Sequence, residues 1–325
     1  MKVYRSLAEI QLRDTTIAIG VFDGVHRGHQ KVLQRARESA MQMPGGQSVA
    51  LTFDKHPAEL VAPAHSPRYL SSLSQRIEMI SKYCPVDALL AIPFDLEFAN
   101  LSAYDFVKTV LVDRLDAIRI FVGADFRYGK DRAGGVMDLQ AAGETYHFGV
   151  DVVHSVAEHG ERVSSTRVRS LIAGGDIRGS ERLLGHPFAM RGTVVTGKRL
   201  GRALGFPTVN LQPEQNRQQL PSSGVYAGRV VLADARFGKS VWPSAISVGV
   251  NPTTDEPGEE LKVEAYLMGG FDGDLYGSSI DIEFVDRLRS EEKFASLEAL
   301  ISQIRLDVKN AELVLKSPHN SVENV

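Results

Sequence analysis

The sequence predicts two domains of different class, a doubly wound parallel α/β domain followed by a small antiparallel β domain that ends in a helix. Three observations predict this: the length of 325 residues, a βα rhythm in the first half, and a strand and turn rhythm after about Leu184. At roughly 150 residues per domain, this length favours two domains. Gly185-His186-Pro187 is the expected boundary, which gives domains 1–185 and 186–325.

The first half alternates apolar runs with helical patterns, as βα units do. The runs recur about every thirty residues, at 16–22, 48–53, 86–92, 117–122 and 148–153. Between them, residues such as Val32, Leu33 and Ala36 share one helical face, and Ser102 is placed to begin a helix. Because the runs are almost wholly apolar, we expect a parallel sheet covered by helices on both faces.

The second half consists of short runs separated by turn residues. The runs lie at 191–196, 225–232, 241–248, 261–268 and 280–285, with glycine and proline dense between them. This pattern is typical of a small antiparallel barrel or sandwich. An apolar stripe from Leu297 to Ala311 predicts a last helix that packs on it, and the polar tail from Ser317 is expected to fray.

Composition excludes some classes of protein. A net charge of -3 argues against a protein that coats nucleic acid. The single cysteine, Cys84, rules out an internal disulfide or a thiolate metal cluster. The first apolar run, 17–22, is too short for a signal core or a membrane span. We therefore expect a cytoplasmic protein with no nucleic-acid or membrane partner.

The segment GVFDGVHRGH, from Gly20 to His29, lies where the first predicted strand passes into the first predicted helix. Helix N-termini at the carboxyl ends of parallel strands bind anions, so a nucleotide phosphate is expected there. Gly24 and Gly28 allow close backbone approach, and His26 and His29 can donate hydrogen bonds to one phosphoryl group. Such fixed donors would stabilise charge that develops in nucleotidyl transfer. Taken alone, the histidines also suit a plain helix start or a metal site.

A second predicted helix start follows at VSSTRVR, residues 163–169. Its hydroxyl and guanidinium groups can bind a leaving pyrophosphate through charge-assisted hydrogen bonds. The alternative is that Ser164 or Ser165 only caps the helix.

The segment GTVVTGKRLGRALGFPTVN, residues 192–210, combines glycines, cations and oxygen ligands. It lacks the spacing of a Walker P-loop, so another kind of ATP site is expected. Thr208 and Asn210 point to the same side of an extended chain, where both could bind one Mg²⁺. The alternative is a glycine-rich hairpin with a polar tip.

The first-domain segments resemble the HxGH nucleotidylyltransferases, and more narrowly the FAD synthetase module of bacterial bifunctional riboflavin kinase/FMN adenylyltransferases. The resemblance rests on FDGVHRGHQ at 22–30, TF at 52–53 with HP at 56–57, VGADFRYG at 122–129 and SSTRVR at 164–169. It implies direct attack of the FMN phosphate on the α-phosphorus of ATP, with His26 and His29 at that phosphate. The ATP and phosphate ligands it implies are Gly20, Phe22, Gly24, Gly28, Ser165, Thr166 and Arg169. The FMN or nucleotide pocket it implies contains Phe53, Asp125 and Phe126, although Phe126 also suits a purely structural role.

The second-domain segments resemble riboflavin kinase, whose fold is an antiparallel β-barrel with a terminal helix. The matching segments are PSSGVYA at 221–227, VGVNPT at 248–253, FDGDLYG at 271–277 and LRSEEKF at 288–294. The resemblance implies that Glu291 is the general base, although a solvated helix-start acid is the plainer reading of that residue alone. It also implies flavin contacts from Arg289 and Phe294, and Mg²⁺ ligands at Thr208 and Asn210. The ATP ligands it implies are Gly197, Lys198, Gly201, Gly205 and Pro207. Val209, where alanine is common, and the glycine-rich turn at 266–271 depart from the family pattern.

Together the two resemblances imply an enzyme that phosphorylates riboflavin with ATP to FMN and then adenylylates FMN with ATP to FAD and pyrophosphate, both steps with Mg²⁺. Its small-molecule partners would be riboflavin, FMN, FAD and ATP, and homo-oligomerisation is left open. One alternative is a nucleotidylyltransferase with another phosphate acceptor, such as pantetheine phosphate, which leaves the second-domain segments unexplained. The other is a flavin-responsive binding protein without turnover.

Overall fold

The computed structural model describes residues 1–158, 160–197, 201, 204–232, 240–249 and 262–317. The chain divides into two compact units: unit 1 is Met1–Pro67 with Leu73–Ser164, and unit 2 is Arg68–Ser72 with Ser165–Val325. The compact division thus falls before the expected domain boundary at residue 185. Helices α7 (Ser165–Gly174) and α8 (Ile177–Leu184) group with unit 2, because α8 packs on two of its strands. The functional boundary at residue 185 stays a prediction.

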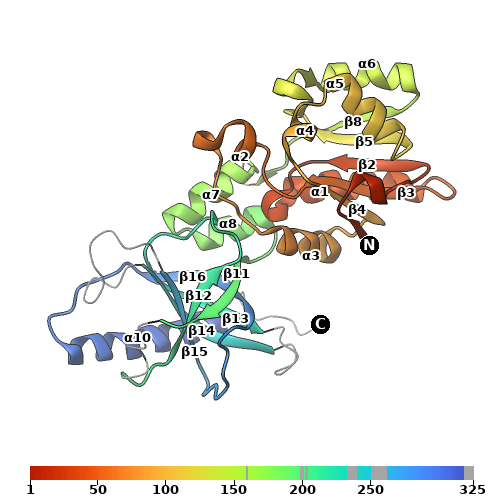
Figure 1. Cartoon of the computed structure of the whole chain (residues 1–325). Coiled ribbons are helices and arrows are strands. Elements are labelled where there is room, and N and C mark those ends of the chain that lie inside the picture. Colours follow the sequence, from red (N-terminus) through yellow and green to blue (C-terminus); the bar gives the residue numbers. More distant parts are fainter. Residues whose placement is uncertain (159, 198–200, 202–203, 233–239, 250–261, 318–325) are drawn as a thin grey trace. The chain divides into compact units, whose positions relative to one another are not determined.

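Unit 1 is built on a six-stranded parallel sheet in the order β1-β4-β3-β2-β5-β8 (Figure 1). Its strands are β1 (Lys2–Tyr4), β2 (Thr15–Ile19), β3 (Gln47–Phe53), β4 (Ala88–Ile92), β5 (Ala117–Gly123) and β8 (Gly149–Val153). The predicted parallel sheet is confirmed. Strand β1 escaped prediction because three residues are too few to form a recognisable apolar run.

Helices cover both faces of this sheet, as its apolar strands predicted. The helical segments are η1 (Leu7–Glu9), η2 (Asp23–Val25), α1 (Arg27–Met41), α2 (Ala58–Val61), η3 (Pro63–His65), α3 (Leu73–Tyr83), α4 (Leu96–Ala99), α5 (Ala103–Asp105), η4 (Phe106–Val112), η5 (Lys130–Arg132) and α6 (Val136–Tyr146). Two short hairpins complete the unit, β6 (Arg127–Tyr128) with β7 (Gly134–Gly135) and β9 (Ala157–Glu158) with β10 (Glu161–Arg162). Apolar residues of α1 and α3 pack in one buried cluster, and those of η4 and α6 in another. The predicted helix start at Ser102 is confirmed, since its hydroxyl accepts the Asp105 backbone N–H at 3.0 Å.

The strand order places a ligand-binding position at the carboxyl end of β2. After β2 the chain adds β3 and β4 on one side, and then returns to place β5 on the other side of β2. Ligands of open α/β sheets bind at such a point of reversal, beyond the carboxyl ends of the strands. The segment from Gly20 to His26 occupies this position, between β2 and α1.

Unit 2 is a closed six-stranded antiparallel barrel in the order β11-β12-β15-β14-β13-β16. Its strands are β11 (Phe188–Val195), β12 (Thr208–Pro213), β13 (Gly224–Leu232), β14 (Ser240–Gly249), β15 (Lys262–Leu267) and β16 (Ser279–Arg289). The structure therefore decides between the barrel and the sandwich that the strand and turn pattern left open.

The predicted last helix is α10 (Leu297–Lys316), which packs against β13, β14 and β16. It begins after Ser296, whose hydroxyl accepts the Ala299 backbone N–H at 3.2 Å. Its buried Ala311 joins Ala227 and Met268 in one apolar cluster. Among the described helices of both units, none is long and apolar enough to cross a membrane.

Candidate active sites

The turn between β2 and α1 has a strained backbone. Phe22, Gly24 and Val25 have φ angles of 53°, 75° and 41°. A positive φ costs glycine little, but it is a genuine outlier for a β-branched residue such as valine. Strain of this kind persists only where the surroundings enforce it, and it clusters at functional sites. This makes the turn a candidate ligand-binding element.

Three side chains hold this turn in place through its carbonyl groups. The Val21 carbonyl accepts hydrogen bonds from Arg76 Nη1 at 2.9 Å and from Thr52 Oγ1 at 3.0 Å. The Val25 carbonyl accepts from Gln30 Nε2 at 2.8 Å. These bonds fix the backbone of the turn through the protein's own side chains, and a fixed, preorganised backbone is what electrostatic catalysis requires.

The two predicted histidines lie directly against each other. Their rings stack with centroids 3.6 Å apart and planes 15° from parallel. His26 caps α1, because its Nδ1 accepts the His29 backbone N–H at 3.2 Å. The neutral His26 ring therefore carries its proton on Nε2, where it can donate to a ligand. A Cβ on Gly28 would lie 3.1 Å from the His26 ring, so glycine at this position makes room for the imidazole itself.

The predicted aromatic members of the FMN pocket belong to one continuous series of ring contacts. The Phe53 ring lies 5.8 Å from Phe98, and Phe98 lies 6.1 Å from Phe106. Phe106 lies 5.5 Å from Tyr128, which in turn stacks on Phe126 at 5.5 Å. Three intervening rings thus connect Phe53 to Phe126, and all five belong to one apolar cluster of unit 1.

The remaining predicted residues of the first site lie elsewhere. Asp125 forms an exposed ion pair with Arg162 at 3.1 Å. Ser165, Thr166 and Arg169 belong to α7 in unit 2, where Arg169 Nε donates to the Arg68 carbonyl at 2.6 Å. Their approach to the histidine pair of unit 1 stays a prediction.

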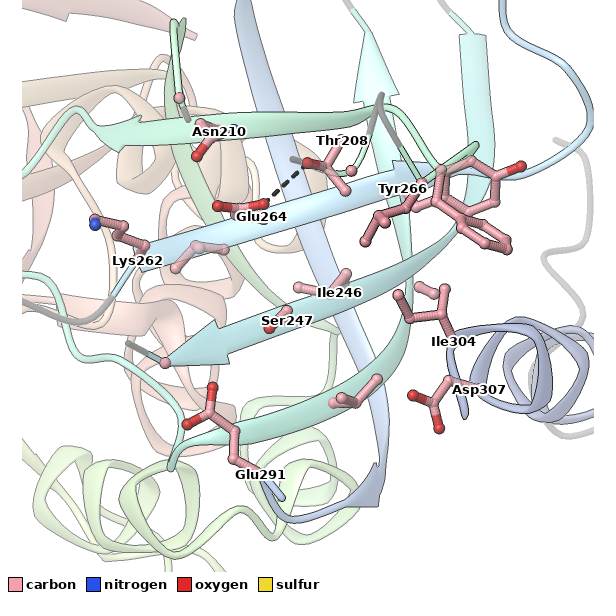
Figure 2. A pocket seen from close by; sticks show the side chains of 18 of the residues that line it. Thr208, Asn210, Ile246, Ser247, Lys262, Glu264, Tyr266, Glu291, Ile304 and Asp307 are labelled. Carbon is pink, nitrogen blue, oxygen red and sulfur yellow. Dashed lines mark hydrogen bonds between the residues drawn. The ribbon is translucent and has the colours of Figure 1, made fainter. Parts of the chain in front are cut away.

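Unit 2 contains a cavity of about 510 Å³ on the outer face of the barrel wall. Along β15 the cavity-lining Lys262, Glu264 and Tyr266 alternate with the buried Val263 and Ala265, so they point away from the barrel interior. The other walls are β12, β14, α10 and the segment that follows β16. Figure 2 shows Asn210, Glu264 and Lys262 toward one end of this cavity, and Ile304 and Asp307 of α10 toward another.

The two predicted metal ligands meet a third oxygen ligand in this cavity. Thr208 Oγ1 donates a hydrogen bond to Glu264 Oε2 at 2.9 Å, and Asn210 is the register partner of Glu264 (Figure 2). A Cβ on Gly197 would lie 2.5 Å from the Asn210 amide, so glycine lets the preceding loop approach it. A hydroxyl, an amide and a carboxylate are hard oxygen ligands, and this donor set fits Mg²⁺. Sequence reasoning missed Glu264 because its position opposite Asn210 depends on which strands pair.

Glu291 also lines the cavity, but on a different part of the wall. Its carboxylate lies over Gly249 at the end of β14, so closely that a Cβ on this glycine would fall on the carboxylate. Glu264 is the register partner of Ser247, two residues before Gly249 on the same strand. Four carboxylates therefore line the cavity, those of Glu264, Glu291, Glu292 and Asp307, and the sequence pointed only to Glu291 among them.

Arg289 and Phe294, the two predicted flavin contacts, also line the cavity, and their contact with flavin stays a prediction. The Arg289 guanidinium lies 5.7 Å from the Phe294 ring, and it forms a bidentate ion pair with Asp307 of α10. Asp307 was not identified from the sequence.

The predicted ATP ligands of the barrel lie around the loop before β12. Gly197 and Gly201 line the cavity, and the Gly201 carbonyl accepts the Phe206 backbone N–H at 2.7 Å. Gly205 has a φ of 84°, and Pro207 directly precedes β12. Lys198 lies outside the described residues.

Comparisons with known proteins match the parallel-sheet part and the barrel part of the chain to two different families. The family model of FAD synthetase matches residues 8–167, and that of riboflavin kinase matches residues 184–315. The chain is 38% identical over 322 residues to a bifunctional riboflavin kinase/FMN adenylyltransferase of Pseudomonas fluorescens, covering 98% of this chain and 100% of the relative. It is 37% identical over 310 residues to the protein of the same description from Escherichia coli K12, covering 94% and 96%.

A solved structure described as a macrolide-efflux protein from Streptococcus pneumoniae is also similar. It aligns with a TM-score of 0.78 at 29% identity, over 95% of this chain and 98% of that chain. The likeness therefore extends over both units.

Proposed function

The chain belongs to the family of bifunctional riboflavin kinase/FMN adenylyltransferases, and we propose that its two units house the two reactions at separate sites. Unit 2 phosphorylates riboflavin at the barrel cavity, and the histidine pair of unit 1 serves the adenylylation of FMN. The observation that carries this assignment is that one chain contains two dissimilar candidate phosphate sites. One is a strained helix-start turn with stacked imidazoles, and the other is a cavity with three grouped oxygen ligands.

For the kinase reaction, Thr208 and Asn210 would hold Mg²⁺, with Glu264 beside them. The bound ion would neutralise charge on the ATP phosphates. The ribityl 5′-hydroxyl oxygen bonds to the γ-phosphorus, the bond from that phosphorus to the bridging oxygen breaks, and ADP leaves. Glu291 takes the hydroxyl proton as general base. Glu264 is the alternative candidate for the general base, because its hydrogen bond to Thr208 places it beside the expected metal ligands.

For the adenylyl transfer, an FMN phosphate oxygen attacks the α-phosphorus of ATP and pyrophosphate leaves. His26 and His29 donate hydrogen bonds to the charge that develops on the α-phosphate, so no covalent nucleophile is needed. Gly20, Phe22, Gly24 and Gly28 shape the turn under the phosphates. Ser165, Thr166 and Arg169 bind the leaving pyrophosphate, and Phe53, Asp125 and Phe126 contribute to the FMN or nucleotide pocket.

Of the two alternatives, transfer to a different phosphate acceptor would leave unit 2 without a role. The riboflavin kinase match over residues 184–315 supports the flavin assignment instead. We also propose that the protein works in the cytoplasm. We propose in addition that it has no nucleic-acid partner, because its net charge of -3 gives no broad cationic field.

The direct test is a time course of purified protein with riboflavin, ATP and Mg²⁺, with the flavins separated by chromatography. We expect FMN to appear first and FAD to follow at its expense. Chelation of Mg²⁺ should stop both steps. Riboflavin that stays unconverted, or FMN that accumulates without FAD, would contradict the proposal.

Replacing Arg76 by methionine is expected to slow FAD formation from FMN and to leave FMN formation from riboflavin unchanged. Arg76 is 0% exposed and donates to the Val21 and Phe53 carbonyls, so methionine fills its space but takes a donor from each, with Thr52 still donating to Val21. Each such loss costs about 1–3 kcal/mol, and here it would loosen the strained turn. Both rates and the thermal unfolding of the variant should be measured.

The matched control is Arg35→Met, at an exposed position on α1 of the same unit. It should leave both reactions unchanged. An Arg76→Met protein that makes FAD at the normal rate would show that the turn does not depend on this side chain.

A further inference from the structure

A buried ion pair joins the end of the barrel to the terminal helix. Arg289 is the last residue of β16, and Asp307 lies in the middle of α10. Arg289 Nη2 lies 2.7 Å from Asp307 Oδ2, and Nε lies 2.9 Å from Oδ1. The two side chains are 17% and 6% exposed. Such bidentate arginine–carboxylate pairs are strong and fix the geometry of both partners.

The same guanidinium also holds the segment that carries Glu291. Arg289 Nη1 donates to the Ser290 carbonyl at 2.9 Å, and the guanidinium faces the Phe294 ring at 5.7 Å. Gln303 Nε2 donates to Asp307 Oδ1 at 2.9 Å, which orients the carboxylate from its own helix. One ion pair thus links β16, the 290–296 segment and α10.

The linked elements form the cavity wall opposite the expected metal ligands. Leu300, Ile304 and Val308 of α10 line the cavity, and they offer an apolar surface suited to a flavin ring. Thr208 and Asn210 stand on β12, which pairs with β11 and β15 and not with β16. A displacement of α10 would therefore disturb the flavin end of the cavity more than its phosphate end.

We propose that Asp307 is a positioning residue of the kinase site: by fixing Arg289, it sets the flavin-facing side of α10 and the segment of Glu291 together. The inference rests on the proposed kinase function. Removing the carboxylate leaves a mostly buried guanidinium without its main partner, which favours local rearrangement of both elements. A misplacement of about 1 Å at a reacting centre can lower a rate by about 10²-fold.

The test is Asp307→Asn, which keeps the size of the side chain and removes its charge. We expect the KM for riboflavin to rise and kcat/KM for riboflavin to fall roughly 10- to 100-fold, with the KM for ATP unchanged. FAD formation from added FMN should be normal. The matched control is Glu312→Gln on the same helix, whose carboxylate is 46% exposed and pairs with Lys316, and it should change neither KM.

A folded Asp307→Asn protein with an unchanged KM for riboflavin, or with both KM values raised equally, would overturn the proposal. If the Asp307→Asn protein does not fold, the Arg289→Lys variant tests the same ion pair from its other side. Lysine keeps the charge but cannot hold Asp307 and Ser290 together, so the same selective rise is expected and an unchanged KM for riboflavin would refute it. The wild-type assay distinguishes failure of the Asp307 proposal from failure of the proposed kinase function, because only the latter predicts a wild-type protein that makes no FMN.

Discussion

Replacing His29 by alanine is expected to lower FAD formation from FMN by roughly 10²- to 10³-fold, the cost of losing one preorganised donor. FMN formation from riboflavin should continue at the normal rate, because Glu264, Glu291 and the barrel cavity belong to unit 2. The stacked His26 ring should stay in place, since it is fixed by its cap on α1. Both reactions are measured on one preparation, with FMN or riboflavin as the flavin supplied.

The chain offers a separate folding reporter in each unit for this experiment. Its only cysteine, Cys84, lies in unit 1 and its only tryptophan, Trp242, lies in unit 2. Burial raises the pKa of the Cys84 thiol to about 12, so the folded unit holds almost no reactive thiolate at pH 8. Slow alkylation of Cys84 and native Trp242 fluorescence would show that both units are folded. Loss of both reactions in such a protein would refute the two-site assignment.

The sheet and the barrel were predictable because their strands bury apolar residues in unbroken or alternating patterns. Phe22 is an exception, because its apolar side chain does not belong to a strand. The apolar run predicted a strand over 16–22, but β2 ends at Ile19 and Phe22 adopts a left-handed conformation. Phe22 is 1% exposed, so its apolar character serves the packing of the turn and not a strand. The strain that makes the turn a candidate site is a product of tertiary packing, which the local pattern does not reveal.

The candidate site residues divide in a similar way. His26, His29, Thr208 and Asn210 could be identified because short spacings along one segment bring each pair together. Glu264 and Asp307 could not, because their partners are distant in sequence: Thr208 lies 56 residues from Glu264, and Arg289 lies 18 residues from Asp307. An isolated acid on a strand or a helix resembles an ordinary solvated residue until the pairing of the elements is known.

Replacing Glu291 by glutamine is expected to slow FMN formation strongly and to leave FAD formation from FMN unchanged. Glutamine keeps the shape of the side chain that lies over Gly249, but it cannot take up the proton of the ribityl hydroxyl. General-base catalysis contributes roughly 10²- to 10⁴-fold, so kcat for riboflavin should fall within that range. The loss should persist at saturating Mg²⁺, since Glu291 stands apart from Thr208 and Asn210.

The matched variant is Glu264→Gln, which removes the carboxylate of the same cavity that hydrogen-bonds to Thr208. If Glu264 supports the metal site, its variant should need more Mg²⁺ and regain most of its kcat when Mg²⁺ is raised, because the lost charge weakens only the hold on the cation. The Mg²⁺ dependence of kcat in the two variants thus distinguishes support of the metal site from uptake of the hydroxyl proton. A Glu264→Gln enzyme that stays slow at saturating Mg²⁺, beside a Glu291→Gln enzyme of normal rate, would move the proton-accepting role to Glu264, the carboxylate already bonded to Thr208.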